Sequence, residues 1–206
     1  MILSVIIPVF NEEKTIELIL NKVHQVKLPK IKKDIIVVDD CSSDNTSQIL
    51  LRNKRLKSSF KQKSNKFKYF RHKSNLGKGA AIRTGIKHAI GDLVIIQDAD
   101  LEYDPVYYEK LLEPVLKKGA RVVYGSRLMS YPLELWGANK TVLPSHLIAN
   151  KFLTFLTNLL YGSNVTDMET GYKLFRKEVL NKIVINSNKF DFEAEVTAKI
   201  LKRKIP

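Results

Sequence analysis

Short runs of apolar residues, mostly valine and isoleucine, alternate with amphipathic stretches through the first 125 residues of the chain. A continuous run of this kind is typical of a strand buried on both faces of a parallel sheet. Four such strands are predicted at residues 3–9, 35–38, 93–96 and 121–124, with a short one at 68–71. The stretches between them have helical spacing, at residues 12–26, around 49–51, 78–90 and 105–118. This alternation predicts an α/β fold, a mostly parallel sheet with helices on both faces.

The second half of the chain is less regular. Residues 126–142 show no clear period and are predicted to form a loop. Residues 147–160 alternate apolar and polar positions as an amphipathic helix does. The apolar side of that helix either packs on the sheet or lies in a bilayer interface. A further helix is predicted at residues 192–203.

Polar residues gather where three of the predicted strands end. They are Asp39–Asp40, Asp98–Ala99–Asp100 and Gly125–Ser126–Arg127. Ligands of α/β proteins bind beyond the carboxyl ends of the parallel strands. The sequence therefore predicts a binding site at this edge of the sheet.

The triplet Asp98–Ala99–Asp100 places two carboxylates where they can converge on one cation. Mg²⁺ and Mn²⁺ prefer such oxygen ligands and share their remaining positions with water and phosphate. An acidic pair in a loop is common, but two carboxylates directly after a buried strand are costly without a counter-ion. The triplet therefore predicts a divalent metal that carries a diphosphate.

Other polar segments leave two interpretations open. Asp39 and Asp40 either accept hydrogen bonds from a ribose or a base, or cap the following turn. The segment 75–81 lacks the spacing of an ATPase P-loop. Its glycines allow a close backbone approach with Lys78 facing the site, or they simply form a turn. Asp167 or Glu169 is a candidate general base or supporting group.

Composition adds a strong positive charge. The 206 residues suit one domain and carry a formal charge of +14. Ten lysines and arginines, and no carboxylate, lie between Arg52 and Lys73, so the charge belongs mainly to this segment. It is interpreted as a solvated loop or as a contact with an anionic membrane. Nucleic acid is not expected as a partner, because no aromatic-rich strand pattern for stacking bases accompanies the charge.

The cysteine content and the N-terminal segment indicate the cellular compartment of the protein. A single cysteine, Cys41, excludes an intramolecular disulfide and suits a reducing environment. The apolar start at residues 1–8 is too short for a membrane span and lacks the features of a signal peptide. We therefore expect a cytoplasmic protein, with peripheral contact to the cytoplasmic face of a membrane.

Taken together, several motifs resemble those of family 2 glycosyltransferases of the GT-A fold. The match is closest to the branch of dolichol-phosphate mannose synthases and polyprenyl-phosphate glycosyltransferases, and it covers nearly the whole chain. The motifs occur in family-like order at residues 5–13, 37–46, 75–79, 98–102, 124–127 and 167–173. The resemblance implies one Rossmann-like GT-A domain over residues 1–206. Its nucleotide-sugar half would be 1–125, and its acceptor-side half, in contact with a membrane, 126–206.

The resemblance also implies an activity and a set of site residues. The reaction would be an inverting transfer of a hexose from GDP-mannose or UDP-glucose to a polyprenyl or dolichyl phosphate, with Mg²⁺ or Mn²⁺. Donor-binding positions would be Pro8, Phe10, Glu12, Asp39, Asp40, Lys78, Asp98, Ala99 and Asp100. Metal ligands would be Asp98, Asp100 and Glu102, although relatives often have glutamine at the last position. Catalytic positions would be Asp100, Arg127, which meets a phosphate, and Asp167, the candidate base.

Three alternatives stand beside this prediction. A GT-A enzyme acting on a saccharide hydroxyl would need a strong base, whereas a lipid phosphate is already ionised near pH 7. A nucleotidyltransferase would carry a loop rich in glycine and arginine after the first strand, where this chain has Pro8–Glu12. A basic nucleic-acid-binding module would bind oligonucleotides in a salt-sensitive way and would not need Asp98.

Relatives commonly continue beyond the position of Pro206 into a further strand.

Overall fold

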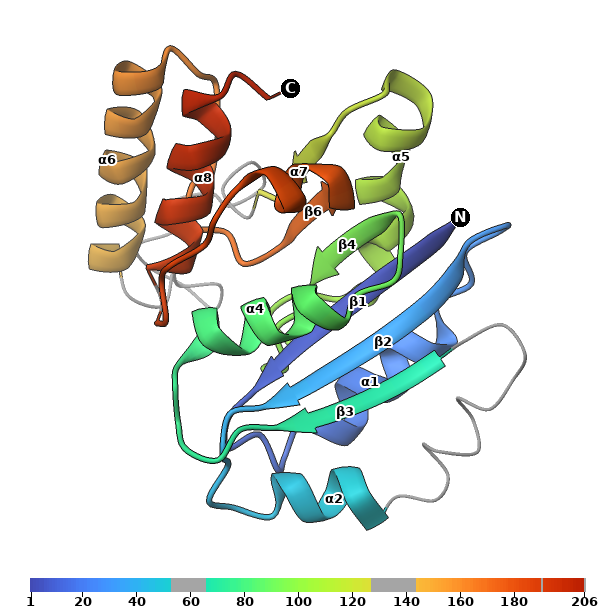
Figure 1. Cartoon of the computed structure of the whole chain (residues 1–206). Coiled ribbons are helices and arrows are strands. Elements are labelled where there is room, and N and C mark those ends of the chain that lie inside the picture. The colour runs from blue at the N-terminus through green and yellow to red at the C-terminus, as the bar shows by residue number, and fades with distance from the viewer. Residues whose placement is uncertain (53–65, 127–143, 190, 206) are drawn as a thin grey trace, which may run out of the picture.

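The computed structural model describes residues 1–52, 66–126, 144–189 and 191–205. At its centre lies a six-stranded sheet of order β3-β2-β1-β4-β6-β5 (Figure 1). The strands are β1 (Ile2–Val9), β2 (Lys32–Asp39), β3 (Lys66–Arg71), β4 (Leu93–Ile96), β5 (Val122–Tyr124) and β6 (Lys173–Arg176). β1 pairs in parallel with β2 and β4, and β2 with β3, whereas β6 runs antiparallel to β4 and β5. The predicted α/β class with a mostly parallel sheet is confirmed.

Strand β6 was not predicted from the sequence. Its apolar run is only Leu174–Phe175, between two basic residues. In the structure, Lys173 is fully buried, and its Nζ donates hydrogen bonds to the carbonyl oxygens of Met168 and Thr170. The same ammonium lies 4.8 Å from the centre of the Tyr124 ring. Because a paired lysine occupies a core position, a hydrophobicity pattern does not detect this strand.

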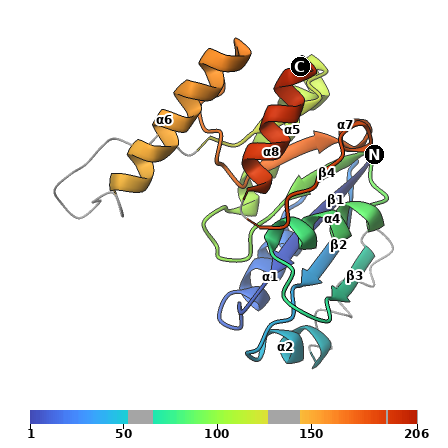
Figure 2. The ribbon, with the colours of Figure 1, turned by 60° about the vertical axis from the view of Figure 1, so that its left-hand side comes forward.

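Helices cover both faces of the sheet, as predicted (Figures 1 and 2). Alternate strand residues face opposite ways: Val37 belongs to one buried cluster and Val38 to the other. On the Val37 side lie α1 (Ile16–Gln25), α2 (Thr46–Arg52) and α5 (Tyr108–Lys118), the last preceded by the 3-10 turn η1 (Pro105–Tyr107). On the Val38 side lie α4 (Lys78–His88), α7 (Lys177–Lys182) and α8 (Phe192–Lys202).

The start of the first helix differs from the prediction. The stretch predicted to be helical from residue 12 forms a helix only from Ile16, and Asn11 before it has a φ of 57°. The Asn11 side chain accepts a hydrogen bond of 2.8 Å from the backbone N–H of Ser43. This contact ties the end of β1 to the loop after β2, so both loops take part in one edge of the sheet. Farther along the chain, Asp104 caps the 3-10 turn η1, because its side chain accepts a hydrogen bond of 2.9 Å from the N–H of Val106.

Helix α6 (Pro144–Tyr161) lies beside α8, on the side away from the sheet (Figures 1 and 2). Unlike a helix that packs on a core, α6 exposes its apolar side and buries polar side chains against the protein. Phe152 and Phe155 are 62% exposed and Leu159 is 68% exposed, whereas the polar Asn150 and Thr154 are buried. Of the two alternatives for this helix, the one in which its apolar side packs on the sheet is therefore wrong. No helix in the described ranges is long and apolar enough to cross a membrane.

Candidate active site at the carboxyl edge of the sheet

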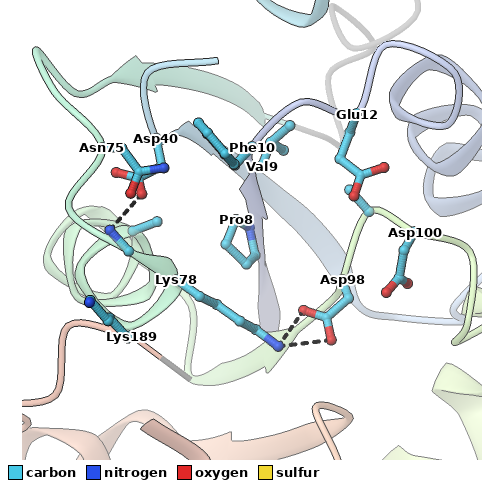
Figure 3. A pocket seen from close by; sticks show the side chains of 13 residues that line it. Pro8, Val9, Phe10, Glu12, Asp40, Asn75, Lys78, Asp98, Asp100 and Lys189 are labelled. Carbon is cyan, nitrogen blue, oxygen red and sulfur yellow. Dashed lines mark hydrogen bonds and ion pairs between the residues drawn. The ribbon is translucent and has the colours of Figure 1, made fainter. Parts of the chain in front are cut away.

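A pocket of about 430 Å³ opens where β1, β2 and β4 end and α4 begins (Figure 3). Residues of five separate segments of the chain contribute to it. Its lining consists of Pro8, Val9, Phe10, Glu12, Asp40, Asn75, Gly77, Lys78, Ala81, Asp98, Ala99, Asp100 and Lys189. Eight of the nine positions expected to bind a donor are in this lining, and Asp39 is the exception. Two of the three strand ends that the sequence singled out, those at Asp40 and at Asp98–Asp100, therefore converge on one cavity, whereas Gly125 and Ser126 are not in its lining.

Asp39 and its neighbour Asp40 have different surroundings. Asp39 is fully buried and accepts hydrogen bonds from the Ser42 N–H at 2.8 Å and the Tyr69 hydroxyl at 3.0 Å. These contacts fit the alternative in which it holds the following turn. Asp40 accepts from the N–H groups of Leu76 (2.9 Å) and Gly77 (2.6 Å), so it fixes the segment that leads into α4.

The two glycines on either side of Lys78 are needed because the backbone at the start of α4 lies very close to another segment of the chain, the loop before α8. A Cβ on Gly77, whose φ is 96°, would lie 2.3 Å from the carbonyl oxygen of Asn188. A Cβ on Gly79 would lie 2.4 Å from the carbonyl oxygen of Ser187. The start of α4 is thus packed directly on the loop before α8. This close approach fixes where the Lys78 side chain begins, and Figure 3 shows that side chain crossing the pocket floor toward Asp98.

Lys78 forms ion pairs with two carboxylates. Its Nζ lies 2.9 Å from Asp98 Oδ1, 3.0 Å from Asp98 Oδ2 and 2.9 Å from Glu193 Oε1. Burial disfavours the charged ammonium, but the two carboxylates more than offset this and raise the pKa of Lys78. The lysine is therefore a fixed positive charge in the pocket.

Glu12 and Asp100 make the opposite side of the pocket acidic. Burial raises the pKa of Asp100, and the nearby charges of Asp98 and Glu102 raise it further. Burial also raises the pKa of Glu12, with a further contribution from Asp100. Carboxylates that disfavour one another's ionisation in this way are typical of a site that accepts a cation.

The three predicted metal ligands do not all converge. Across the described ranges, no group of three or more His, Cys, Asp or Glu side chains is arranged to hold a metal. Glu102 contributes its backbone N–H, which donates to Asp100 Oδ1 at 3.0 Å. Asp98 and Asp100 alone still fit Mg²⁺ or Mn²⁺, because these ions are commonly held by one or two carboxylates together with substrate phosphates.

Two predicted catalytic residues lie elsewhere. Arg127 is outside the described residues. Asp167 is fully buried and accepts a 2.8 Å hydrogen bond from the Asn150 amide of α6. Asp167 is also absent from the lining that the described residues form. The catalytic roles of Asp167 and Arg127 remain predictions.

Five residues of the lining were not among the expected site residues: Val9, Asn75, Gly77, Ala81 and Lys189. Glu193, which binds Lys78, was also missed. Asn75 belongs to the glycine-containing motif and its position could have been included. Lys189 and Glu193 lie more than a hundred residues after Lys78, in a segment without a motif, and only the packing of the loop before α8 brings them in.

Comparison with known proteins identifies the family. The model of glycosyl transferase family 2 matches residues 4–184. The chain belongs to this family, and the resemblance noted in the sequence is confirmed.

Relatives in three archaea have similar sequences. An uncharacterised protein of Methanocaldococcus jannaschii is 34% identical over 93% of this chain and 72% of its own length. A UDP-N-acetylglucosamine–dolichyl-phosphate N-acetylglucosaminyltransferase of Methanococcus voltae is 31% identical over 87% of this chain and 71% of its own. A dolichol-phosphate mannosyltransferase of Pyrococcus furiosus is 28% identical over 95% of this chain. The match spans about half (52%) of that enzyme's length.

Solved structures confirm the GT-A fold. The glucosyl-3-phosphoglycerate synthase of Mycobacterium tuberculosis superposes with a TM-score of 0.70 at 19% identity, over 98% of this chain and 65% of that chain. That structure contains Mn²⁺, UDP and glucosyl-3-phosphoglycerate. At this identity the similarity establishes the fold alone.

Proposed function

We propose that this protein transfers a hexose from a nucleoside-diphosphate sugar to a polyprenyl or dolichyl phosphate. The observation that carries the proposal is the pocket that Asp98 and Asp100 line together with Lys78, whose ammonium is paired with Asp98. Two relatives are named as enzymes that use dolichyl phosphate. GDP-mannose and UDP-glucose are the donors that we propose.

The pocket provides separate contacts for the parts of a donor. Phe10, which is 45% exposed, offers an aromatic surface for the base. Asp98 and Asp100 would hold Mg²⁺ or Mn²⁺, which, when bound, stabilises the negative charge on the diphosphate leaving group. Lys78 and Lys189 supply fixed positive charge for the same phosphates. The chain thereby binds and orients the donor with its anomeric carbon toward the acceptor.

A lipid phosphate suits the acceptor side better than a hydroxyl does. Its oxygen is ionised near pH 7, so it attacks the anomeric carbon without losing a proton, and the bond to the diphosphate breaks. A hydroxyl would need a base within hydrogen-bonding reach, and Asp167 is buried against α6 outside the lining of the pocket. The exposed apolar side of α6 provides a surface for the bilayer that carries such a lipid.

Donor binding is tested by thermal unfolding with UDP or GDP, with and without Mn²⁺. A ligand at 100 times its Kd adds about 2.7 kcal/mol of stability, which raises the Tm of a domain of this size by roughly 5–10 °C. We expect a Mn²⁺-dependent rise with one nucleotide, its loss in Asp98→Asn, and its retention in Glu109→Gln, a change on the exposed surface of α5. A folded wild-type protein with no rise in Tm for either nucleotide would refute the donor site.

The acceptor is tested by sugar transfer from the nucleotide-sugar that binds. Three acceptors are compared: a short-chain polyprenyl phosphate, the matching polyprenol and a saccharide. Transfer to the phosphate alone supports the proposal. Transfer to the saccharide alone would replace it with the hydroxyl-acceptor alternative.

A further inference from the structure

The ion-paired Lys78 joins three elements at the floor of the pocket. It begins α4, its partner Asp98 follows β4, and its second partner Glu193 lies in the first turn of α8. All three side chains are largely buried, with 17%, 13% and 6% exposure for the lysine, Asp98 and Glu193. One ammonium is therefore shared by two carboxylates of which only Asp98 lines the pocket.

A metal ion on Asp98 has to compete with this ammonium. Both oxygens of Asp98 lie within 3.0 Å of Lys78 Nζ. The carboxylate itself has little room to turn away, because a Cβ on Gly171 would lie 2.3 Å from Asp98 Oδ2. The lysine side chain, with four rotatable carbon bonds, is the part that can move. Metal binding thus requires that Lys78 give up contact with Asp98.

Glu193 keeps a partner for Lys78 during such a movement. Its carboxylate is 2.9 Å from the ammonium on the side of α8. A buried ammonium left without a partner would be strongly disfavoured. The diphosphate of a bound donor would replace Asp98 as the second anion, and the lysine would remain between two negative groups.

We infer that Glu193 is a positioning residue that holds the Lys78 ammonium in the pocket. In the free protein this ammonium is paired with Asp98, and when metal and donor bind it pairs with the diphosphate instead. The inference rests on the proposed function. Lys78 then neutralises Asp98 as long as no metal is bound. Glu193, a residue of α8 that no sequence motif indicated, has the role of holding this lysine.

The two residues are predicted to affect Mn²⁺ binding in opposite directions. In Lys78→Gln, Asp98 has no competing cation, so Mn²⁺ alone binds about tenfold more tightly than to the wild type. In Glu193→Gln, the ammonium is shared by one carboxylate fewer and pairs more strongly with Asp98, so Mn²⁺ alone binds about tenfold more weakly. Lys78→Arg keeps the positive charge and returns the Mn²⁺ affinity to near the wild-type value.

The experiment is calorimetric titration of the full chain with Mn²⁺ alone, and then with Mn²⁺ in the presence of the nucleotide that the thermal screen selects. Lys78→Gln is expected to weaken nucleotide binding while it strengthens metal binding, which a mere loss of structure cannot do. Glu109→Gln is the matched surface control. Thermal midpoints confirm that each variant is folded, and if Glu193→Gln does not fold, the contrast between Lys78→Gln and Lys78→Arg decides.

The outcomes separate this inference from the proposed function. Metal-dependent nucleotide binding in the wild type, together with unchanged Mn²⁺ affinity in Lys78→Gln, would overturn the inference and leave the donor site intact. No nucleotide binding in the wild type would overturn the proposed function and, with it, the transfer of Lys78 to a diphosphate.

Discussion

At the scale of single residues, the fit around Asp98 depends on Gly171. A methyl group at this position would overlap Asp98 Oδ2 at 2.3 Å. We predict that Gly171→Ala displaces the carboxylate and weakens Mn²⁺-dependent nucleotide binding by at least about tenfold, as expected for a lost charge-assisted contact. The measurement is the nucleotide Kd at saturating Mn²⁺.

The control for this variant is Gly119→Ala. Gly119 ends α5 with a φ of 71° and has open space around its Cβ position, so alanine there costs about 1 kcal/mol in stability without touching the pocket. Equal nucleotide affinity in the two variants would show that the space at Gly171 is not needed.

A second residue-scale prediction concerns the buried Lys173. Burial lowers its pKa from 10.5 to about 8, although the carboxylates of Glu193, Asp167 and Glu169 partly oppose this. Between pH 8 and 10.5 the unfolded chain holds a proton on this lysine that the folded chain has lost, so stability rises with pH in this window. Lys173→Met lacks this rise.

The measurement is the free energy of unfolding in urea at pH 7.5, 9 and 10.5. The wild type is expected to gain about 3 kcal/mol relative to Lys173→Met across this range. A constant difference between the two proteins would show that the lysine keeps its proton when buried.

Individual residues also show why part of the pocket was predictable. Asp40, Asp98 and Asp100 directly follow buried strands, so the strand pattern locates them. Asp39 is not in the lining, because successive residues at a strand end point to opposite sides, and the strand pattern does not tell which of two aspartates faces a pocket. Glu193 was missed because only tertiary packing of Gly77 and Gly79 on the loop before α8 brings it near Lys78.

At the scale of elements, α6 gives the clearest contrast between pattern and packing. Periodicity identified the helix and its apolar side, but a period does not say what the apolar side faces. The polar side is held by the protein: Thr154 accepts from the Met168 N–H at 3.1 Å, and Asn150 donates to Asp167. The apolar side is consequently left outside.

We predict that this side binds a bilayer. Replacing the exposed Phe152 and Leu159 together by serine should weaken binding to vesicles of anionic phospholipid by more than about tenfold, because each buried apolar side chain contributes about 1.5–3 kcal/mol. Since neither side chain is in the core, the Tm should fall by less than about 4 °C. Vesicle sedimentation gives the partition coefficient.

The comparison variant replaces Val106 and Leu116 by serine. Both side chains are exposed, at 64% and 52%, and they lie near and on α5. If the two double variants lose the same amount of vesicle binding, the effect is one of general hydrophobicity and α6 has no special part in it.

At the scale of the whole molecule, the sheet separates two cores that meet in β6. Leu174 belongs to the cluster under α1 and α5, and Phe175 to the cluster under α4 and α8. We predict that Leu174→Ala costs about 2–5 kcal/mol and Phe175→Ala about 3–5 kcal/mol in the free energy of unfolding. In a urea titration, far-UV circular dichroism reports the loss of secondary structure, and a second probe reports the loss of packing in each core. The transitions should coincide. Separate transitions would mean that the two cores unfold independently.

The βα rhythm of the first 125 residues was sufficient to predict the parallel part of this molecule. The strand order at the other edge of the sheet could not be predicted. β6 has four residues and begins with a buried lysine, so it carries almost no apolar signal. The packing of α6 and α8 depends on that edge. The second half of the chain was therefore predicted as separate elements without an arrangement.

The late position of β6 in the chain has a consequence for biosynthesis. Among the strands that the structure describes, β5 joins the sheet only through β6, and about 50 residues separate the two in the sequence. At about 5–20 residues per second, a ribosome needs roughly 3–10 s to make this stretch. During this interval the nascent chain carries β4 as an unpaired edge, the kind of surface that recruits other strands. A chaperone that covers hydrophobic edges would find its best opportunity in these seconds, before residue 173 has emerged.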